Sequence, residues 1–253
     1  MYPVLIKIGK FQINSWGFMM LIAILLSIWG ISRLFKKQGY NDDIVVELVV
    51  LSALAGVIGS RLAYLIIYEW QEFLLDPLAT LIPSGGISGM IWYGGFLGGF
   101  IVFFLYMRKY KLEFWKISDI FAPFLALSYA IVRIGCFLAG CCYGQETNSA
   151  CGVVFPYVDA LTRHPTQLYS SLLNFMLFLF LIWFYPRRRF DGEVFLLYLI
   201  GYSIYRFIIE YFRENIIFYG PLSMGQVYTL GLLLIAAVIY WWRYKYSKKS
   251  SLL

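Results

Sequence analysis

Seven apolar segments, each about 20 residues long, restrict the possible folds of this chain more than any other feature. Such a segment crosses the hydrocarbon core of a bilayer as an α-helix, in which all backbone polar groups are satisfied internally. With 61% hydrophobic and 14% charged residues, the chain is also too apolar for a soluble domain. We expect an all-α integral membrane protein, with residues 1–253 forming one seven-helix transmembrane domain. The segments lie near residues 13–32, 44–68, 90–107, 118–140, 167–185, 192–212 and 222–242.

The basic residues between these segments predict the orientation of the chain. Of the 21 lysine and arginine residues, 14 follow the first, third, fifth and last segments. The positive-inside rule therefore places the N-terminus outside and the C-terminus in the cytoplasm. This distribution also accounts for the net charge of +7, so we expect no nucleic-acid partner. The outer loops 69–89 and 141–166 are rich in Gly, Pro, Cys and acidic residues, and we expect the site near them.

Three arginines lie inside predicted spans, namely Arg61, Arg133 and Arg206. A cation at this depth is costly and usually faces a polar cavity or an anionic partner. A guanidinium group matches phosphate oxygens in a bidentate way, and lipid headgroups supply phosphate here. Each arginine could instead pair with an acid, reach the interface or cap a helix. Tyr202, Arg206 and Glu210 share one helix face, so Glu210 either neutralises Arg206 or holds it for phosphate.

His164 is the only histidine, and it stands in the sequence R-H-P-T-Q-L-Y at the mouth of the fifth segment. Its ordinary pKa of about 6.5 suits proton transfer near neutral pH. The following Pro165 fits the start of a helix equally well, which leaves a structural role open. Gly94 and Gly95 belong to a run whose spacing permits tight helix packing. Alternatively, these two glycines leave room for a lipid beside Tyr93.

Cysteines occur at positions 136, 141, 142 and 151, the last three in or beside an outer loop. Outside the cytoplasm, we expect a disulfide between Cys151 and either Cys141 or Cys142. A zinc site with His164 would lack the paired C-x-x-C spacing, and we expect no metal. A reactive thiol or a thiol-disulfide relay is the other alternative.

Seven motifs follow one another along the chain: G-V-I-G-S-R-L-A-Y, Y-G-G-F-L-G-G, S-D-I-F-A-P, R-I-G-C-F-L-A-G-C-C-Y-G, R-H-P-T-Q-L-Y, G-Y-S-I-Y-R-F-I-I-E-Y-F-R and S-M-G-Q. Together they resemble the prolipoprotein diacylglyceryl transferases. These membrane enzymes move a diacylglyceryl group from phosphatidylglycerol to the lipobox cysteine thiol of a prolipoprotein and release glycerol phosphate. The resemblance implies a multi-pass protein of the bacterial cytoplasmic (inner) membrane. Its partners would be phosphatidylglycerol, membrane lipid and the prolipoprotein signal peptide, and we expect a monomer without a cofactor.

The resemblance, together with the residue chemistry above, assigns candidate roles. We expect catalytic roles for five residues and substrate binding by nine others. The catalytic candidates are Arg133, Arg206, His164, Tyr93 and Glu210. The substrate-binding candidates are Arg61, Gly94, Gly95, Asp119, Gly135, Arg163, Gln167, Tyr169 and Tyr202.

The chain departs from the family pattern where protons would be handled. Tyr93 replaces the histidine of the family's H-G-G, and Cys136, Ala139 and Cys141 replace Asn, Asn and Glu in its signature. We expect two arginines, Arg133 and Arg206, to hold the lipid phosphate and stabilise the leaving group. The thiol then loses its proton to His164 or Tyr93, or the arginine charges lower its pKa.

The departures keep two other functions open. The chain could be a divergent family member that transfers a glycerolipid fragment to another acceptor or binds lipid without catalysis. It could also be a membrane thiol-disulfide protein, as the adjacent Cys141 and Cys142 suggest. A redox relay would depend on its cysteines and not on its arginines.

Overall fold

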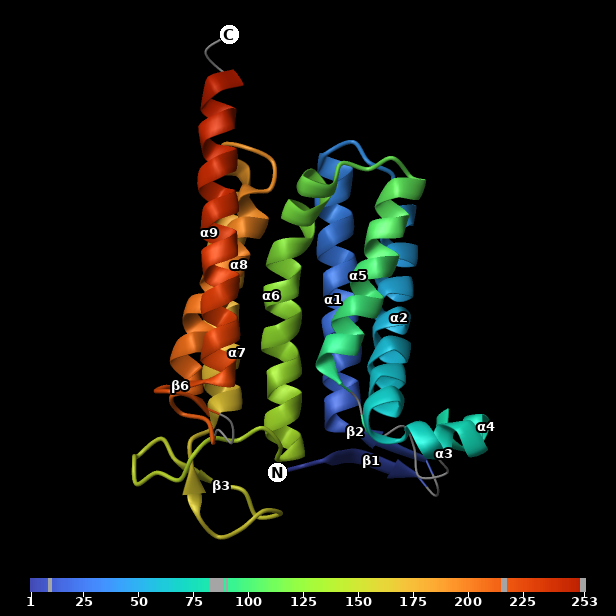
Figure 1. Ribbon diagram of the computed structural model, residues 1–253, viewed down its shortest axis with the longest axis vertical. Coiled ribbons are helices and arrows are strands. Elements are labelled where there is room, and N and C mark those ends of the chain that lie inside the picture. The colour runs from blue at the N-terminus through green and yellow to red at the C-terminus, as the bar shows by residue number, and fades with distance from the viewer. Residues whose placement is uncertain (9–10, 82–88, 90, 215–217, 251–253) are drawn as a thin grey trace. The chain divides into compact units, whose positions relative to one another are not determined.

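The computed structural model describes all residues except 9–10, 82–88, 90, 215–217 and 251–253. Within the described residues, seven long helices overlap the seven apolar segments (Figure 1). They are α1 (Ser15–Lys37), α2 (Asp43–Tyr68), α5 (Trp92–Lys109), α6 (Phe114–Ala139), α7 (Thr166–Phe184), α8 (Glu193–Glu210) and α9 (Met224–Ser250). Part of the predicted outer loop 69–89 lies outside the described residues.

Short elements connect the long helices. Two short helices, α3 (Trp70–Leu75) and α4 (Pro77–Leu81), follow α2, and a 3₁₀ turn, η1 (Tyr185–Arg187), follows α7. The chain also forms three short antiparallel hairpins, but it is mostly helical, in agreement with the expected all-α membrane protein. The hairpins are β1 (Val4–Ile8) with β2 (Phe11–Asn14), β3 (Val153–Val154) with β4 (Thr162–Arg163), and β5 (Phe218–Tyr219) with β6 (Leu222–Ser223).

Five of the long helices, α1, α2, α6, α7 and α9, are long and apolar enough to cross a membrane. The other two long helices, α5 and α8, are less apolar, for reasons visible in their sequences. Helix α8 carries the charged residues Glu193, Arg206 and Glu210, and α5 is rich in glycine. Five candidate spans establish a multi-pass membrane protein, and the seven-span topology stays a prediction.

The exposed helix faces fit a lipid environment. On α7, Leu172, Met176, Leu179 and Trp183 lie on one face, and each is more than half exposed. A stripe of this kind would be costly in water, whereas lipid tails replace the missing protein contacts. We infer that this face of α7 contacts the hydrocarbon core.

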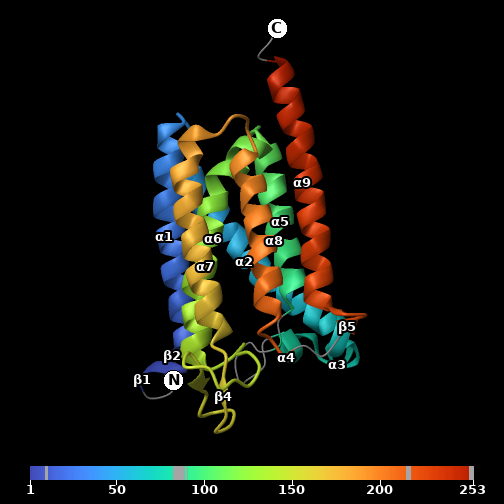
Figure 2. The same cartoon turned by 90° about the vertical axis from the view of Figure 1, so that its left-hand side faces the viewer.

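The chain divides into two compact units, residues Met1–Ile31 with Trp115–Leu253, and residues Ser32–Phe114. We call them the first unit and the second unit, and the expected single domain stays a prediction. Within the first unit, α8 packs against both α7 and α9 (Figure 2). The hairpin β3–β4 lies at the end of this unit where α6 ends and α7 begins.

Two helices of the second unit, α2 and α5, contact each other through glycine. A Cβ atom on Gly94 would collide with the backbone oxygen of Gly59 and with the side chain of Ala63. Gly95 lies against Gly56 and Ser60 of the same helix. The close approach therefore explains the glycine run as helix packing. The structure assigns Gly94 and Gly95 to this contact, and the expected lipid-binding role has no support from it.

Replacing Gly94 by valine should lower the melting temperature of the purified protein. Its side chain would overlap α2, and overpacking typically costs about 1–3 kcal/mol. Gly231→Val on α9 is the matched control, because a Cβ atom there meets no other atom within 4 Å. Thermal unfolding in detergent measures both variants, and equal melting temperatures would contradict the packing assignment.

The S-M-G-Q motif forms the N-terminal cap of α9. The Ser223 hydroxyl accepts a hydrogen bond from the Gln226 backbone N–H at 3.2 Å. In return, the Gln226 side-chain oxygen accepts one from the Ser223 N–H at 3.0 Å. This reciprocal pair is a capping box, which satisfies donors at the start of a helix. The motif therefore fixes where α9 begins.

Asp119 of α6 caps the start of α8 instead of joining the predicted site. Its fully buried carboxylate accepts hydrogen bonds from the N–H groups of Gly192 at 2.8 Å and Phe195 at 2.9 Å. Arg188 lies 3.7 Å away and partly neutralises it. A carboxylate at a helix N-terminus is also favoured by the helix dipole. The structure therefore gives Asp119 a structural role, and its expected substrate-binding role stays a prediction.

Candidate functional site

Helices α6 and α8 bring two of the predicted arginines close to one pair of tyrosines. The guanidinium group of Arg133 donates a hydrogen bond to the Tyr129 hydroxyl and lies 4.7 Å from the centre of its ring. Tyr129 packs edge-on against Tyr202, with ring centres 6.2 Å apart. Tyr202 in turn interacts electrostatically with both Arg133 and Arg206. Tyr202 thus links Arg133 and Arg206, and their expected role as one site stays a prediction.

Glu210 holds Arg206 from the next turn of α8. The distance between Arg206 Nη1 and Glu210 Oε2 is 2.6 Å, which confirms the predicted ion pair. The carboxylate also lies against the start of α9, where a Cβ atom on Gly225 would come within 2.5 Å of Glu210 Oε1. Because the carboxylate is packed on both sides, it fixes one orientation of the Arg206 side chain.

Arg213 adds a third positive charge to this group. Burial, and then the positive charge of Arg206, lowers the pKa of Arg213, while Glu210 acts in the opposite direction. The positive charge of Arg133 also lowers the pKa of Arg213. Among the described residues, the Glu210 carboxylate pairs with Arg206 and acts on Arg213. The resulting excess of positive charge can bind an anion such as a phosphate group.

His164 lies in a small aromatic cluster at the start of α7. Its Nδ1 atom is 3.3 Å from the Tyr169 hydroxyl, and its ring packs edge-on against Phe212 at 5.1 Å. The His164 carbonyl accepts a hydrogen bond from the Gly144 N–H at 2.8 Å. This contact ties the histidine to the loop that follows α6. Nε2 is the ring atom that remains to exchange a proton with a substrate.

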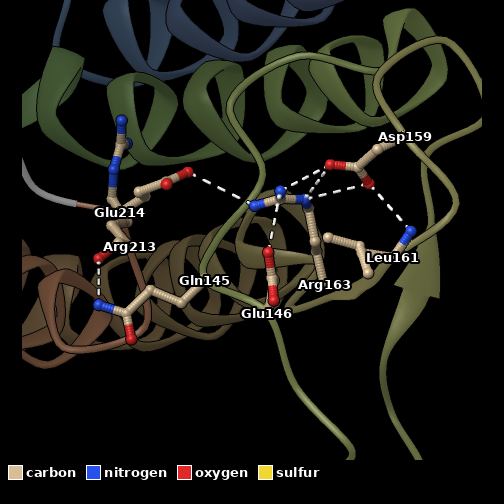
Figure 3. A network of polar contacts seen from close by, with 7 residues as sticks. All are labelled: Gln145, Glu146, Asp159, Leu161, Arg163, Arg213 and Glu214. Carbon is tan, nitrogen blue, oxygen red and sulfur yellow. Dashed lines mark hydrogen bonds and ion pairs between the residues drawn. The ribbon is translucent and has the colours of Figure 1, made fainter.

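Arg163 lies at the centre of an ionic network that holds the outer loop together (Figure 3). Its buried guanidinium group contacts Asp159 at 2.6 Å, Glu214 at 3.4 Å and Glu146 at 3.5 Å. It also lies 5.1 Å from the centre of the Tyr143 ring. Protein groups thus surround this arginine and give it a structural role, and the expected contact with substrate stays a prediction.

This network predicts that loop stability depends on pH. Hydrogen bonds from Arg163, and then from the Leu161 N–H, hold the pKa of Asp159 below its ordinary value. A depressed carboxyl pKa contributes stability above the unfolded pKa of about 4 and loses it as pH falls through the folded pKa. Asp159→Asn should therefore lower the melting temperature at pH 7, and its difference from wild type should shrink below about pH 4.

Glu146→Gln is the matched control for this prediction, because Glu146 is more exposed and its contact with Arg163 is longer. Its effect on the melting temperature should be smaller at every pH. A constant difference between Asp159→Asn and wild type from pH 7 to pH 3 would contradict the role given to Asp159.

Three of the four cysteines gather around the C-terminal end of α6. The sulfur atoms of Cys136, Cys141 and Cys142 all lie within 4.8 Å of one another. Gln167 donates a hydrogen bond from Nε2 to the Cys141 carbonyl at 2.6 Å, so it supports the cysteine loop. All four cysteines are free thiols in the structure. The expected disulfide of Cys151 is thus not formed here, and for oxidised protein it stays a prediction.

Two of the remaining candidates, Gly135 and Arg61, have contacts within the protein. A Cβ atom on Gly135 would meet Met19 and Trp16 of α1 at about 3 Å, so this glycine permits helix packing. In the second unit, buried Arg61 donates hydrogen bonds to the carbonyl groups of Thr80 at 2.5 Å and Gly89 at 3.3 Å. Arg61 also pairs with Glu69 at 3.3 Å. Tyr93 is 61% exposed at the start of α5.

Sequence reasoning missed Tyr129 and Arg213 as members of the site. Tyr129 stands four residues before Arg133, so helical spacing could have paired them. Arg213 comes just after the sixth apolar segment, outside the predicted span. The electrostatic interaction of Arg213 with Arg133 joins distant parts of the chain, which residue spacing does not reveal.

Comparison with known proteins gives one consistent result. A family model described as prolipoprotein diacylglyceryl transferase matches residues 3–242. Three similar relatives are each named phosphatidylglycerol–prolipoprotein diacylglyceryl transferase. The protein from Legionella pneumophila (strain Philadelphia 1) is 36% identical over 250 residues, covering 94% of this chain and 96% of the relative. The Clostridium tetani protein is 35% identical over 219 residues, with 85% and 86% covered. The Acinetobacter baumannii (strain SDF) protein is 35% identical over 260 residues, with 98% and 93% covered.

Proposed function

The chain belongs to the prolipoprotein diacylglyceryl transferase family, and on this premise we propose that it modifies prolipoproteins with lipid. The reaction transfers a diacylglyceryl group from phosphatidylglycerol to the lipobox cysteine thiol in the prolipoprotein signal peptide. Glycerol phosphate leaves. The observation that carries the proposal is the group of Arg133, Arg206 and Arg213, in which Glu210 pairs with Arg206 and acts electrostatically on Arg213.

The arginines bind the headgroup phosphate and stabilise the leaving group. As the C–O bond between glyceryl carbon and phosphate breaks, negative charge grows on the departing oxygen. Guanidinium groups that are already in position stabilise this charge without further reorganisation. Tyr129 and Glu210 hold Arg133 and Arg206 in place. Bidentate geometry then orients the glyceryl carbon for attack.

His164 accepts the proton of the attacking thiol in this mechanism. A free thiol has a pKa of about 8.5, so little thiolate exists at neutral pH without a base. His164 is held by Tyr169 through Nδ1, which supports Nε2 as the accepting atom. We expect His164→Ala to slow transfer in the assay for diacylglyceryl transfer, because the thiol then lacks this base. Tyr93 belongs to the second unit and is the alternative base at the position of the family histidine.

We further propose seven spans with the N-terminus outside and the C-terminus in the cytoplasm of the bacterial inner membrane. The protein acts as a monomer. In the first unit, the end of α6, the start of α7 and hairpin β3–β4 lie at one end of the helices (Figure 1). The basic turn Arg187–Arg189 follows the other end of α7. By the positive-inside rule, the cysteine loop and His164 then face the outside.

A direct transfer assay tests the function. Purified protein is incubated with phosphatidylglycerol labelled in its acyl chains and with a peptide that carries a lipobox cysteine. We expect a thioether-linked diacylglyceryl peptide and an equal amount of glycerol phosphate. A peptide with serine in place of that cysteine is the control. Release of glycerol phosphate without peptide modification would indicate another acceptor, and binding of lipid without release would indicate a catalytically inactive lipid-binding protein.

A further inference from the structure

The cysteine loop is the strongest feature of the first unit that the arginine site does not explain. It contains three thiols, those of Cys136, Cys141 and Cys142, whose sulfur atoms lie within 4.8 Å of one another. Cys136 is buried near the end of α6, and the other two thiols belong to exposed residues. A disulfide joins two sulfur atoms, so it would not account for the third thiol.

The backbone explains why the thiols converge. Gly140 has a left-handed conformation with φ of 75°, so the chain turns back and the Cys141 N–H donates to the Cys136 carbonyl at 3.1 Å. This is the hydrogen-bond pattern that ends many helices at a glycine. Cys142 also has a positive φ of 63°, which is costly for a residue with a Cβ atom. Such strain persists only where the surrounding structure enforces it.

Helix α7 enforces this conformation. Thr166 donates a hydrogen bond to the Cys142 carbonyl at 2.9 Å, and Gln167 donates one to the Cys141 carbonyl at 2.6 Å. Both residues are buried in the first turn of α7. The two carbonyl groups are therefore fixed before any ligand arrives, and the thiols are preorganised on a rigid support.

The sulfur spacing fits a thiophilic cation. Thiolates about 2.3 Å from a tetrahedral zinc ion lie roughly 3.8 Å apart, so small side-chain movements complete the site. Three thiolates give zinc an excess of negative charge. Arg133 and Arg213 act electrostatically on the Cys142 thiol and compensate that charge. Soft sulfur ligands favour zinc over magnesium or calcium.

We propose that Cys136, Cys141 and Cys142 bind a zinc ion whose fourth ligand is the thiol of the acceptor peptide. The role of the fourth ligand rests on the proposed function. Three protein ligands with one open position are typical of catalytic zinc sites. Arg133 stands one helical turn before Cys136, so the phosphate-binding group and the metal lie on one face of α6. The nucleophile and the leaving group are thus brought together.

The reaction balances without a redox partner. The acceptor thiol gives its proton to His164 as its sulfur binds zinc. The sulfur then supplies the electron pair for a new C–S bond to the glyceryl carbon, while the C–O bond to the phosphate breaks. The electron pair of the broken C–O bond leaves with glycerol phosphate. Glycerol phosphate later takes up the proton from the histidine through water. Zinc stays in the same oxidation state and keeps its three protein ligands.

Metal binding is measured first, on reduced, full-length protein in detergent. Elemental analysis should find one zinc ion per chain. Titration of the metal-free protein with Co²⁺ should give charge-transfer absorption from sulfur. We expect serine at position 136, 141 or 142 to weaken Co²⁺ binding by about 10-fold or more. Mutating a residue that only hydrogen-bonds to a metal ligand already lowers metal affinity by about 10–100-fold. Cys151→Ser is the matched control and should bind Co²⁺ as wild type does.

The absorption spectrum of the Co²⁺-bound protein also tests whether the acceptor thiol is the fourth ligand. Adding the lipobox peptide should increase the sulfur charge-transfer band, and the peptide with serine should not. A bound metal without this increase would overturn the fourth-ligand role. A Cys136–Cys141 or Cys136–Cys142 disulfide in place of bound metal would overturn the whole site in favour of a redox pair.

Transfer activity separates this inference from the proposed function. Full transfer by chelated, metal-free protein would overturn the zinc proposal and leave the transferase function standing. If the protein bound the metal and the peptide thiol but transferred nothing from phosphatidylglycerol, the transferase function would be overturned and the zinc site would stand. Loss of transfer on chelation, restored by added zinc, is the result that we expect.

Discussion

Arg133→Lys and Arg206→Lys should each lower the turnover of diacylglyceryl transfer by on the order of tenfold or more, and alanine at either position by about 10²-fold. Lysine keeps the charge but presents a point charge in place of a planar fork, so it cannot hold two phosphate oxygens at once. It would also lose the stacking of Arg133 on the Tyr129 ring. The transfer assay, with turnover expressed per folded protein, measures the effect.

Arg108→Lys is the matched control for these variants. Arg108 is an exposed arginine in the last turn of α5, so the same change there should leave turnover near that of wild type. Arg206 also pairs with Glu210, and its replacement can destabilise the fold. Thermal unfolding of each variant separates this loss from a catalytic one. Near-normal turnover of both folded lysine variants would rule out phosphate binding by these arginines.

Local patterns in the sequence predicted the helices and the core of the site. The length of each apolar segment located the seven long helices, because a helix in lipid satisfies its own hydrogen bonds. The i, i+4 spacing predicted the pair between Arg206 and Glu210, which the structure confirms at 2.6 Å. Both features depend on residues within one helix, and such spacing is visible in the sequence.

Contacts between distant residues could not be predicted in this way. Asp119 belongs to a family motif, yet its partners stand 73 and 76 residues further along the chain. Arg163 likewise pairs with Glu214, 51 residues away. A motif identifies a residue as characteristic of the family but does not say whether it touches substrate or supports the fold. That distinction depends on tertiary packing.

The cysteine cluster shows the same limit. The spacing of Cys136, Cys141 and Cys142 lacks the C-x-x-C pattern that indicates zinc in a sequence. The sulfur atoms meet because Gly140 and Cys142 both adopt left-handed conformations and α7 holds the loop. Two of these cysteines occupy positions where the family signature has Asn and Glu. These two departures from the family pattern therefore lie together in the first unit.

Asp119→Ala should destabilise the protein by about 3 kcal/mol or more, while the folded fraction keeps its turnover. The change leaves the N–H groups of Gly192 and Phe195 without their acceptor. It also leaves Arg188 without its buried partner. An unsatisfied buried donor costs about 1–3 kcal/mol, and breaking a buried ion pair about 3–5 kcal/mol. Thermal unfolding in detergent and the transfer assay measure the two effects separately.

Asp191→Ala is the matched control, because Asp191 contacts the same Arg188 at the same distance of 3.7 Å but has a 41% exposed side chain. An exposed pair contributes about 1 kcal/mol or less, so this variant should melt close to wild type. The comparison decides between two roles for a motif residue. If Asp119 bound the lipid, folded Asp119→Ala would lose turnover or need more phosphatidylglycerol for half-maximal rate. If it caps α8, the variant would lose thermal stability and keep both kinetic parameters.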